Sequence, residues 1–331
     1  MITRRAAIQF AGGALLGATF GAGSETRRLP RLGWVANTLP VMGMSGLDPA
    51  DPLMRAFAHG LRDLGFVEGR NIVIERRSAE GRPERLPGIM RELVALPVDV
   101  IFTIGPAAIA AHQATETIPI VVIYGGDVVQ ERLASSLGRP DRNITGLTDV
   151  SDTIHGKRLQ LLGEAAPKIS RVGVIAYHPP RAAWRVATES AARALKLNVV
   201  WIGVNAPQEY STAFATIVRE GANAIYPTDT TINYVHRRTI IDFAAKQRLP
   251  AVYIERAFVD DGGLMSYGPD FIDMYRRAAT FVKKILDGSK PSDLPIEQPK
   301  KFELLINART AARLGLPISQ NLRLRADEVI Q

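Results

Sequence analysis

Cysteine is absent from this 331-residue sequence, and histidine is scarce. Without cysteine there is no disulfide bond, no thiolate metal site, no cysteine nucleophile and no lipid-modified cysteine. The five histidines never stand three or four positions apart, the spacing that places two metal ligands on one face of a helix. The sequence therefore predicts no metal site, and we expect no cofactor.

Recognised catalytic motifs are missing as well. The chain has no G-x-S-x-G turn, no phosphate-binding G-x-x-x-x-G-K-[ST] loop, and no G-x-G-x-x-G segment after an expected strand. Asp260 and Asp261 are adjacent, but neighbouring residues in a turn point apart, so a solvated turn explains them better than a catalytic pair. We predict that the protein is not an enzyme.

Acidic residues are fewer than basic ones, 33 against 41, which gives a formal net charge of +8. The basic residues are spread along expected helix faces and form no block, so we expect a solvated basic surface and no nucleic-acid partner. Long apolar runs are also lacking. Beyond the N-terminus, no segment approaches the roughly 20 residues that a membrane-spanning helix needs.

The first 23 residues have the pattern of an export signal. Arg4 and Arg5 precede a mildly apolar segment rich in Ala and Gly, and small residues lead into the polar stretch that begins at Ser24. The paired arginines favour the twin-arginine route. A membrane anchor is the alternative, although the apolar run is shorter than roughly 20 residues. We therefore expect a periplasmic protein, and its length favours two domains.

Short runs rich in Val and Ile alternate with helical patterns along the rest of the chain. This order is typical of βαβ units, so the expected fold class is α/β with parallel, doubly wound sheets. The runs are too many for one compact domain, which predicts two sheets of about four to six strands each. The expected strands are 31–36, 71–77, 98–105, 118–126, 143–147, 171–177, 198–204, 223–228, 250–255 and 263–268. The expected helices lie near 52–64, 83–96, 106–114, 154–165, 182–195, 209–220, 233–247 and 270–286.

Small, polar or aromatic residues follow the carboxyl ends of successive expected strands, where open α/β sheets bind ligands. Each also suits a structural role: Asp127 and Asp229 as helix caps, Gly125 in a tight turn, Tyr124 and Tyr267 in the core. If two domains face each other with strand ends inward, these residues open onto one crevice. The predicted ligand-binding residues are Asn37, Thr38, Gly105, Tyr124, Gly125, Asp127, Tyr177, Thr228, Asp229, Glu255 and Tyr267.

Several segments, among them "SLGRPDRNITG", "KRLQLLGEAAPKISRVGVI" and "GGLMSYGPDFIDMYRRAATFVKKILDGSKPSDLPIEQPKKFELLINARTAARLGLPI", are similar to a family of bacterial ABC-transporter substrate-binding proteins. The family includes tryptophan- and phenylalanine-binding members and resembles type I periplasmic binding proteins in fold. The resemblance implies a monomer of two domains joined by three hinge crossings, which delivers a small molecule to an ABC permease in the inner membrane. The expected domains are 29–147 plus 263–295 and 148–262 plus 296–331.

The resemblance also implies roles for particular residues. Tyr124 or Tyr267 would stack on an aromatic ligand, and Asp127 would hold its ammonium group. Relatives commonly have a hydroxyl residue before the proline of the third strand's loop, whereas this chain has Gly105 followed by Pro106. A hydroxyl that could hold a ligand carboxylate is therefore missing there.

We thus predict the periplasmic receptor of an ABC importer, with an amino acid, aromatic or branched, as the favoured ligand. The alternative is a receptor that signals to a membrane sensor, and neighbouring permease and ATPase genes would distinguish the two.

Overall fold

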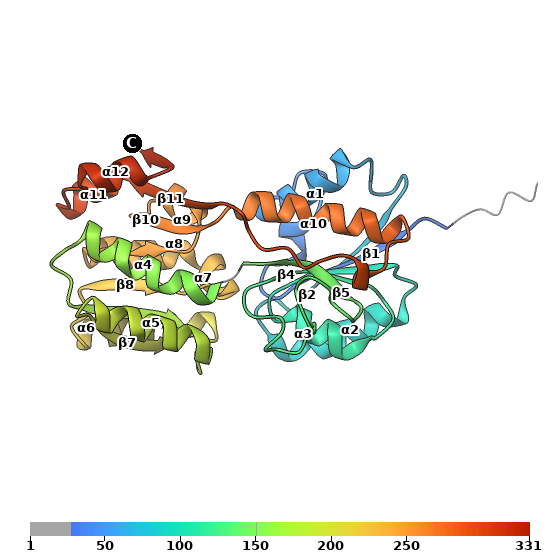
Figure 1. Cartoon of the computed structure of the whole chain (residues 1–331), viewed down its shortest axis with the longest axis horizontal. Coiled ribbons are helices and arrows are strands. Elements are labelled where there is room, and N and C mark those ends of the chain that lie inside the picture. The colour runs from blue at the N-terminus through green and yellow to red at the C-terminus, as the bar shows by residue number, and fades with distance from the viewer. Residues whose placement is uncertain (1–27, 150) are drawn as a thin grey trace, which may run out of the picture.

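The computed structural model describes residues 28–149 and 151–331, and the predicted export signal, residues 1–23, lies outside them. The described chain forms two lobes arranged along the long axis of the molecule (Figure 1). Each lobe is built of β-strands covered by helices, as the alternating sequence pattern predicts. No helix within the described ranges is both long enough and apolar enough to cross a bilayer.

The N-terminal lobe is built on a five-stranded parallel sheet in the order β2-β1-β3-β4-β5. Its strands are β1 (Arg31–Ala36), β2 (Val73–Ser78), β3 (Val100–Ile104), β4 (Ile120–Tyr124) and β5 (Ile144–Thr148). One face is covered by α1 (Pro52–Asp63) and α10 (Phe271–Leu286), and the other by α2 (Leu86–Ala95) and α3 (Ala107–Ala114) (Figure 1). Three 3-10 helices accompany this lobe: η1 (Val41–Met44), η2 (Pro83–Arg85) and η4 (Pro291–Asp293).

Side chains of these strands alternate between the two helical layers, because successive residues of a strand point to opposite faces. Trp34 packs with Phe57 and Phe102 beneath α1 and α10, whereas Val35 packs with Leu93 beneath α2 and α3. Both faces of the central strands β1, β3 and β4 are therefore apolar, whereas the edge strand β2 carries Glu75, Arg76 and Arg77 in its middle. In the central strands, polar residues lie at or near the strand ends and in the loops that follow the carboxyl ends.

The C-terminal lobe contains two sheets, β7-β6-β8 and β12-β11-β10-β9, linked by an isolated bridge between Ile225 and Ala251. Its strands are β6 (Arg171–Ala176), β7 (Asn198–Gly203), β8 (Ala224–Pro227), β9 (Val252–Tyr253), β10 (Met265–Pro269), β11 (Phe302–Asn307) and β12 (Glu328–Ile330). Its helices are α4 (Ser151–Ala165), α5 (Ala182–Ala194), η3 (Pro207–Glu209), α6 (Tyr210–Arg219), α7 (Thr231–Val235), α8 (Arg237–Lys246), α9 (Arg256–Asp260), α11 (Ala308–Leu314) and α12 (Gln320–Arg325). The strand pairs are parallel except β10 with β11.

The chain passes between the lobes after β5, after β10, and in the extended segment 298–301 before β11 (Figure 1). The prediction that residues 263–269 belong to the N-terminal domain is wrong, because β10 pairs with β9 and β11 in the C-terminal lobe. Glu297, predicted to lie in the C-terminal domain, instead pairs with β5 of the N-terminal lobe. The strand pattern identified the first segment but not the pairing of Glu297, and sheet membership depends on backbone pairing that the pattern does not contain.

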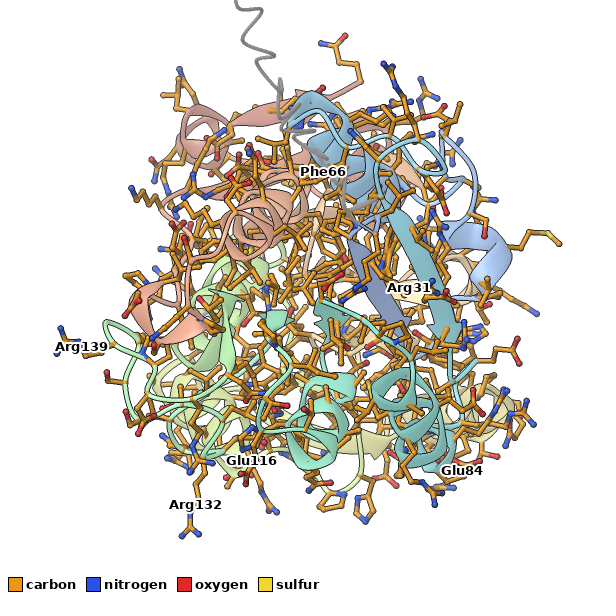
Figure 2. The ribbon with its side chains drawn as sticks, turned by 90° about the vertical axis from the view of Figure 1, so that its right-hand side faces the viewer. Arg31, Phe66, Glu84, Glu116, Arg132 and Arg139 are labelled. Atoms are coloured by element: carbon orange, nitrogen blue, oxygen red, sulfur yellow. The ribbon has the colours of Figure 1, made fainter. Side chains whose placement is uncertain are left out.

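Charged side chains of both signs project from separate parts of the N-terminal lobe. Figure 2 looks onto the end of that lobe, where Glu84, Glu116, Arg132 and Arg139 point outward from different loops and helix ends. This distribution agrees with a solvated surface whose basic residues are not grouped.

Candidate functional site

A cavity of about 170 Å³ lies between the two lobes. From the N-terminal lobe it is lined by the ends of β1, β3 and β4 and by parts of α1 and α10; from the C-terminal lobe, by residues that follow β6, β8 and β9. The two domains therefore face each other with their strand ends inward. Six predicted residues line the cavity: Asn37, Gly105, Gly125, Tyr177, Asp229 and Glu255.

The other five predicted residues do not line this cavity, and structural contacts account for four of them, all but Thr38. Thr228 donates its hydroxyl to the Ile175 carbonyl at 3.1 Å, and Asp127 caps a turn by accepting from the backbone N–H of Val129 at 2.8 Å. The Tyr267 ring stacks on Phe302, with centroids 6.0 Å apart, in the C-terminal lobe. The remaining two predicted residues outside the lining are Thr38 and Tyr124.

Tyr124 is fully buried in the N-terminal core, so the prediction that it stacks on a ligand is corrected. Its hydroxyl accepts a hydrogen bond from Nη2 of Arg181 at 3.0 Å. The Arg181 guanidinium also lies 3.0 Å from Glu131 and 5.2 Å from the ring centroid of Trp184. Arg181 belongs to the C-terminal lobe, whereas Tyr124 and Glu131 belong to the N-terminal lobe. This arginine therefore ties the two lobes together at one side of the cavity.

Gly126 allows this approach of Arg181. Its φ is +147°, and a Cβ placed on it would lie 1.6 Å from Nη1 of Arg181. A Cβ at this position would displace the guanidinium, and the backbone conformation itself favours glycine, so Gly126 permits this placement of Arg181.

Asp51 and Tyr234 form a second link across the cleft. Oδ1 of Asp51 accepts from the N–H groups of Leu53 and Met54 at the start of α1, and Oδ2 accepts from the Tyr234 hydroxyl at 2.9 Å. Sequence reasoning did not select Asp51 for the site, although Asp-Pro at a helix start is a strong capping signal. The signal identifies the cap but not the tyrosine that reaches it from the other lobe.

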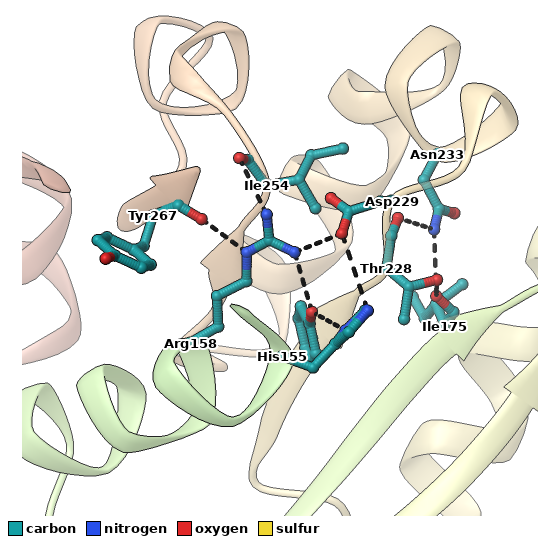
Figure 3. Close-up of polar contacts among 9 residues, drawn as sticks. His155, Arg158, Ile175, Thr228, Asp229, Asn233, Ile254 and Tyr267 are labelled. Carbon is teal, nitrogen blue, oxygen red and sulfur yellow. Dashed lines mark hydrogen bonds and ion pairs between the residues drawn. The ribbon is translucent and has the colours of Figure 1, made fainter. Parts of the chain in front are cut away.

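Asp229 is held at the cavity wall by a buried arginine. Figure 3 shows the Arg158 guanidinium among Asp229, Ile254 and Tyr267. It donates to Oδ2 of Asp229 at 2.5 Å, to the Tyr267 carbonyl at 2.6 Å and to the Ile254 carbonyl at 3.4 Å. Because these partners lie just after β8, within β10 and just after β9, Arg158 links three strands at once.

The same cluster contains a neutral histidine. His155 is fully buried, and its Nδ1 lies 2.5 Å from the Tyr226 hydroxyl. Burial lowers the pKa of His155 to about 3, although the Asp229 carboxylate opposes the shift. The pair of Arg158 and Asp229 is therefore the charged part of the cluster, and His155 adds no positive charge to it at neutral pH.

Glu255 lines the same cavity and is 8% exposed. Burial, followed by the charge of Asp51, raises its pKa to about 8, and Arg237 acts in the opposite direction. Within the described residues its carboxyl group makes no hydrogen bond or ion pair. With its pKa raised to about 8, the carboxyl group is largely protonated at neutral pH in the ligand-free protein.

The rest of the cavity wall is mainly apolar and aromatic, with contributions from both lobes. Trp184 and Tyr177 line it on the C-terminal side, and Phe271 and Tyr275 on the N-terminal side. Such a cavity suits a small molecule with an apolar body and a polar end.

The family model of ABC transporter substrate binding proteins matches residues 46–330 of this chain. The chain belongs to that family. The resemblance read from the sequence is thereby confirmed. This ABC transporter substrate-binding protein is 28% identical over 271 residues to a curated tyrosine-binding protein of Clostridioides difficile (strain R20291), with 80% of this chain and 77% of the relative covered.

Solved structures share the fold of this substrate-binding protein and confirm the predicted α/β class. A conserved domain protein from Vibrio cholerae matches with a TM-score of 0.80 and 24% identity, covering 91% of this chain and 100% of the other. An ABC domain from Streptococcus pneumoniae in complex with L-Trp matches with a TM-score of 0.79 and 21% identity, covering 92% and 100%. In the part of the chain that the structure describes, no group of three His, Asp or Glu side chains could hold a metal ion.

Proposed function

We propose that this protein is the periplasmic ligand receptor of an ABC importer, which closes on one small molecule in the cavity between its lobes. The observation that carries the proposal is that strand ends of both lobes line that cavity. A ligand that contacts both lobes binds the closed form more tightly than the open form, so it shifts the open–closed equilibrium. The closed form is what a membrane permease could distinguish from the empty receptor.

An amino acid with an aromatic or branched side chain is the ligand class that we propose. The walls formed by Trp184, Phe271 and Tyr275 suit such a side chain, and Asp229 and Glu255 offer acceptors for an ammonium group. The tyrosine-binding relative and the L-Trp complex among the structural neighbours support the same class.

A thermal-shift screen of the mature protein against the standard amino acids tests this proposal. A ligand at 100 times its dissociation constant adds about 2.7 kcal/mol to stability, which is a clear rise in melting temperature. Small-angle X-ray scattering should then show a smaller radius of gyration with the ligand bound. Trp184→Ala should reduce the shift, whereas Val186→Ala, which is 65% exposed on the same helix, should retain it. Absence of any shift, or a full shift in Trp184→Ala, would contradict the proposal.

Transport requires a second experiment, in cells that lack the gene. Slower uptake of the identified ligand is expected if the receptor delivers it to a permease. Unchanged uptake with loss of a transcriptional response would instead assign the receptor to a membrane sensor.

A further inference from the structure

We propose that the cleft recognises its ligand as a cation, an amine carried on an aromatic or branched apolar body, and that a ligand carboxylate is not needed for binding. This inference rests on the proposed function, because it names the ligand class of the same cleft. It differs from an amino-acid receptor of the ordinary kind, in which both charged ends of the ligand are held.

The charges that line the cavity are mostly negative. Among the described residues that line it, Arg181 is the basic one, and its guanidinium is already engaged by Glu131 at 3.0 Å and by the Tyr124 hydroxyl. Arg158 lies behind the wall and is paired with a carboxylate of the lining. The carboxylate residues of the lining are Asp51, Asp149, Asp229 and Glu255.

Two buried oxygen atoms in this wall have no hydrogen-bond donor among the described residues. They are Oδ1 of Asn37 and Oδ1 of Asp229. The Asn37 residue is 4% exposed and the Asp229 side chain 6%, and both residues line the cavity. A buried acceptor without a donor is unfavourable, and an ammonium group brings three donors and no acceptor. The Glu255 carboxyl group, on the same wall, supplies a further acceptor.

For a carboxylate the described lining offers one comparable buried donor, Nε1 of Trp184, which is neutral and has no acceptor among the described residues. At the start of α3, Gly105 and Pro106 carry no hydroxyl, and the N–H groups of Ala108 and Ile109 already donate to the carbonyls of those two residues. The ordinary anion site at a helix N-terminus, with free N–H groups and a hydroxyl, is therefore not assembled here. A carboxylate would instead lie among the negative charges of the lining.

Two matched sets of probes test the inference with the wild-type protein, by isothermal titration calorimetry at pH 8. One set is tyramine, tyrosine and 3-(4-hydroxyphenyl)propanoate; the other is 3-methylbutylamine, leucine and 4-methylpentanoate. In each set the side group is kept while the carboxylate or the amine is removed. We expect that in at least one set the amine binds as tightly as the amino acid or more tightly, and that the acid does not bind.

The outcomes separate the two proposals. If an amino acid binds but the matching amine does not, or if an acid binds, the inference is overturned and the proposed function stands. Absence of binding by all six probes would overturn the inference, and the proposed function would fall only if the screen against the standard amino acids also shows no shift.

Glu255→Gln provides the matched variant, because it keeps the shape of the side chain and removes its charge. Affinity for the amine should fall by about 10- to 100-fold, since a hydrogen bond to a charged group is lost. Glu84→Gln, at an exposed site far from the cavity, should bind the amine like the wild type (Figure 2). The melting temperature of each ligand-free variant verifies its fold. If a folded Glu255→Gln protein binds the amine with wild-type affinity, Glu255 is not part of the site. If its preference for tyramine over tyrosine is also unchanged, Glu255 does not contribute to recognition of the amine.

Discussion

The stability of the ligand-free protein should depend on pH through Glu255. Burial raises the pKa of this side chain from 4.5 to about 8, with a further contribution from Asp51. The folded protein therefore holds the Glu255 proton more tightly than the unfolded chain does. Its contribution to folding is complete below pH 4.5 and is lost as the pH rises towards 8, the opposite of a carboxylate that is stabilised by an ion pair.

The magnitude follows from the two pKa values. Each pH unit between them changes the free energy of unfolding by about 1.4 kcal/mol at full effect, so the loss across the window is up to about 5 kcal/mol. Glutamine cannot ionise, and Glu255→Gln should therefore lack this loss. The variant should gain stability relative to the wild type as the pH rises from 5 to 8.

Urea unfolding of both proteins at pH 5, 6, 7 and 8 measures this difference. Other charged or titratable groups face Glu255 from the elements packed around it, but both proteins contain them, so their contributions largely cancel in the difference. These groups are Asp51, Arg158, Asp229, Tyr234, Arg237 and Tyr275. Glu84→Gln, at an exposed site, should follow the wild type at every pH. Parallel pH profiles for Glu255→Gln and the wild type would refute the reasoning.

Three further changes have expected outcomes. Gly60→Ala should lower the free energy of unfolding by about 1–3 kcal/mol in urea melts, because the added Cβ would lie 2.7 Å from a backbone carbonyl oxygen of α10. The control is Gly88→Ala, whose added Cβ meets no atom within 4 Å and should not destabilise the protein. Tyr234→Phe removes the hydroxyl that links the lobes, so ligand affinity in calorimetry should fall by about 2- to 10-fold; an unchanged affinity would show that the link does not favour closure. Arg158→Met leaves the buried Asp229 carboxylate unpaired and should lower the free energy of unfolding by about 3–5 kcal/mol, measured by urea or thermal unfolding. Arg325→Met removes a surface ion pair and should lower it by less than about 1 kcal/mol.

Local patterns were sufficient for most of the helices and strands. The helix predicted near 270–286 is α10, with Asp270 as its cap, and the strand predicted at 171–177 contains β6. The helix predicted at 233–247 is instead two helices, α7 and α8, which meet at His236. The periodicity continues across that residue, so the sequence does not reveal the break. The short elements α9, β11, α11, α12 and β12 were also missed, because so few residues carry little periodic signal.

The sequence predicted part of the candidate site, because the order of the strands indicates which residues stand at their carboxyl ends. Residues at the carboxyl ends of parallel strands meet at one edge, so Asn37, Gly105 and Glu255 could be selected from the order of elements alone. Whether a residue at such an end faces the cleft or the core depends on its exact register. Tyr124 is the last residue of its strand and faces the core, and this orientation could not be read from its position.

The sequence by itself determined the α/β class, the family and the edge of each sheet at which a ligand would bind, because these follow from periodicity, turn residues and motifs within short segments. Only the tertiary structure decided which partners meet across the cleft. Asp51 and Tyr234 are 183 positions apart, and Arg181 and Tyr124 are 57 positions apart. Contacts of that kind depend on how the two lobes close on each other, and no local pattern carries this information.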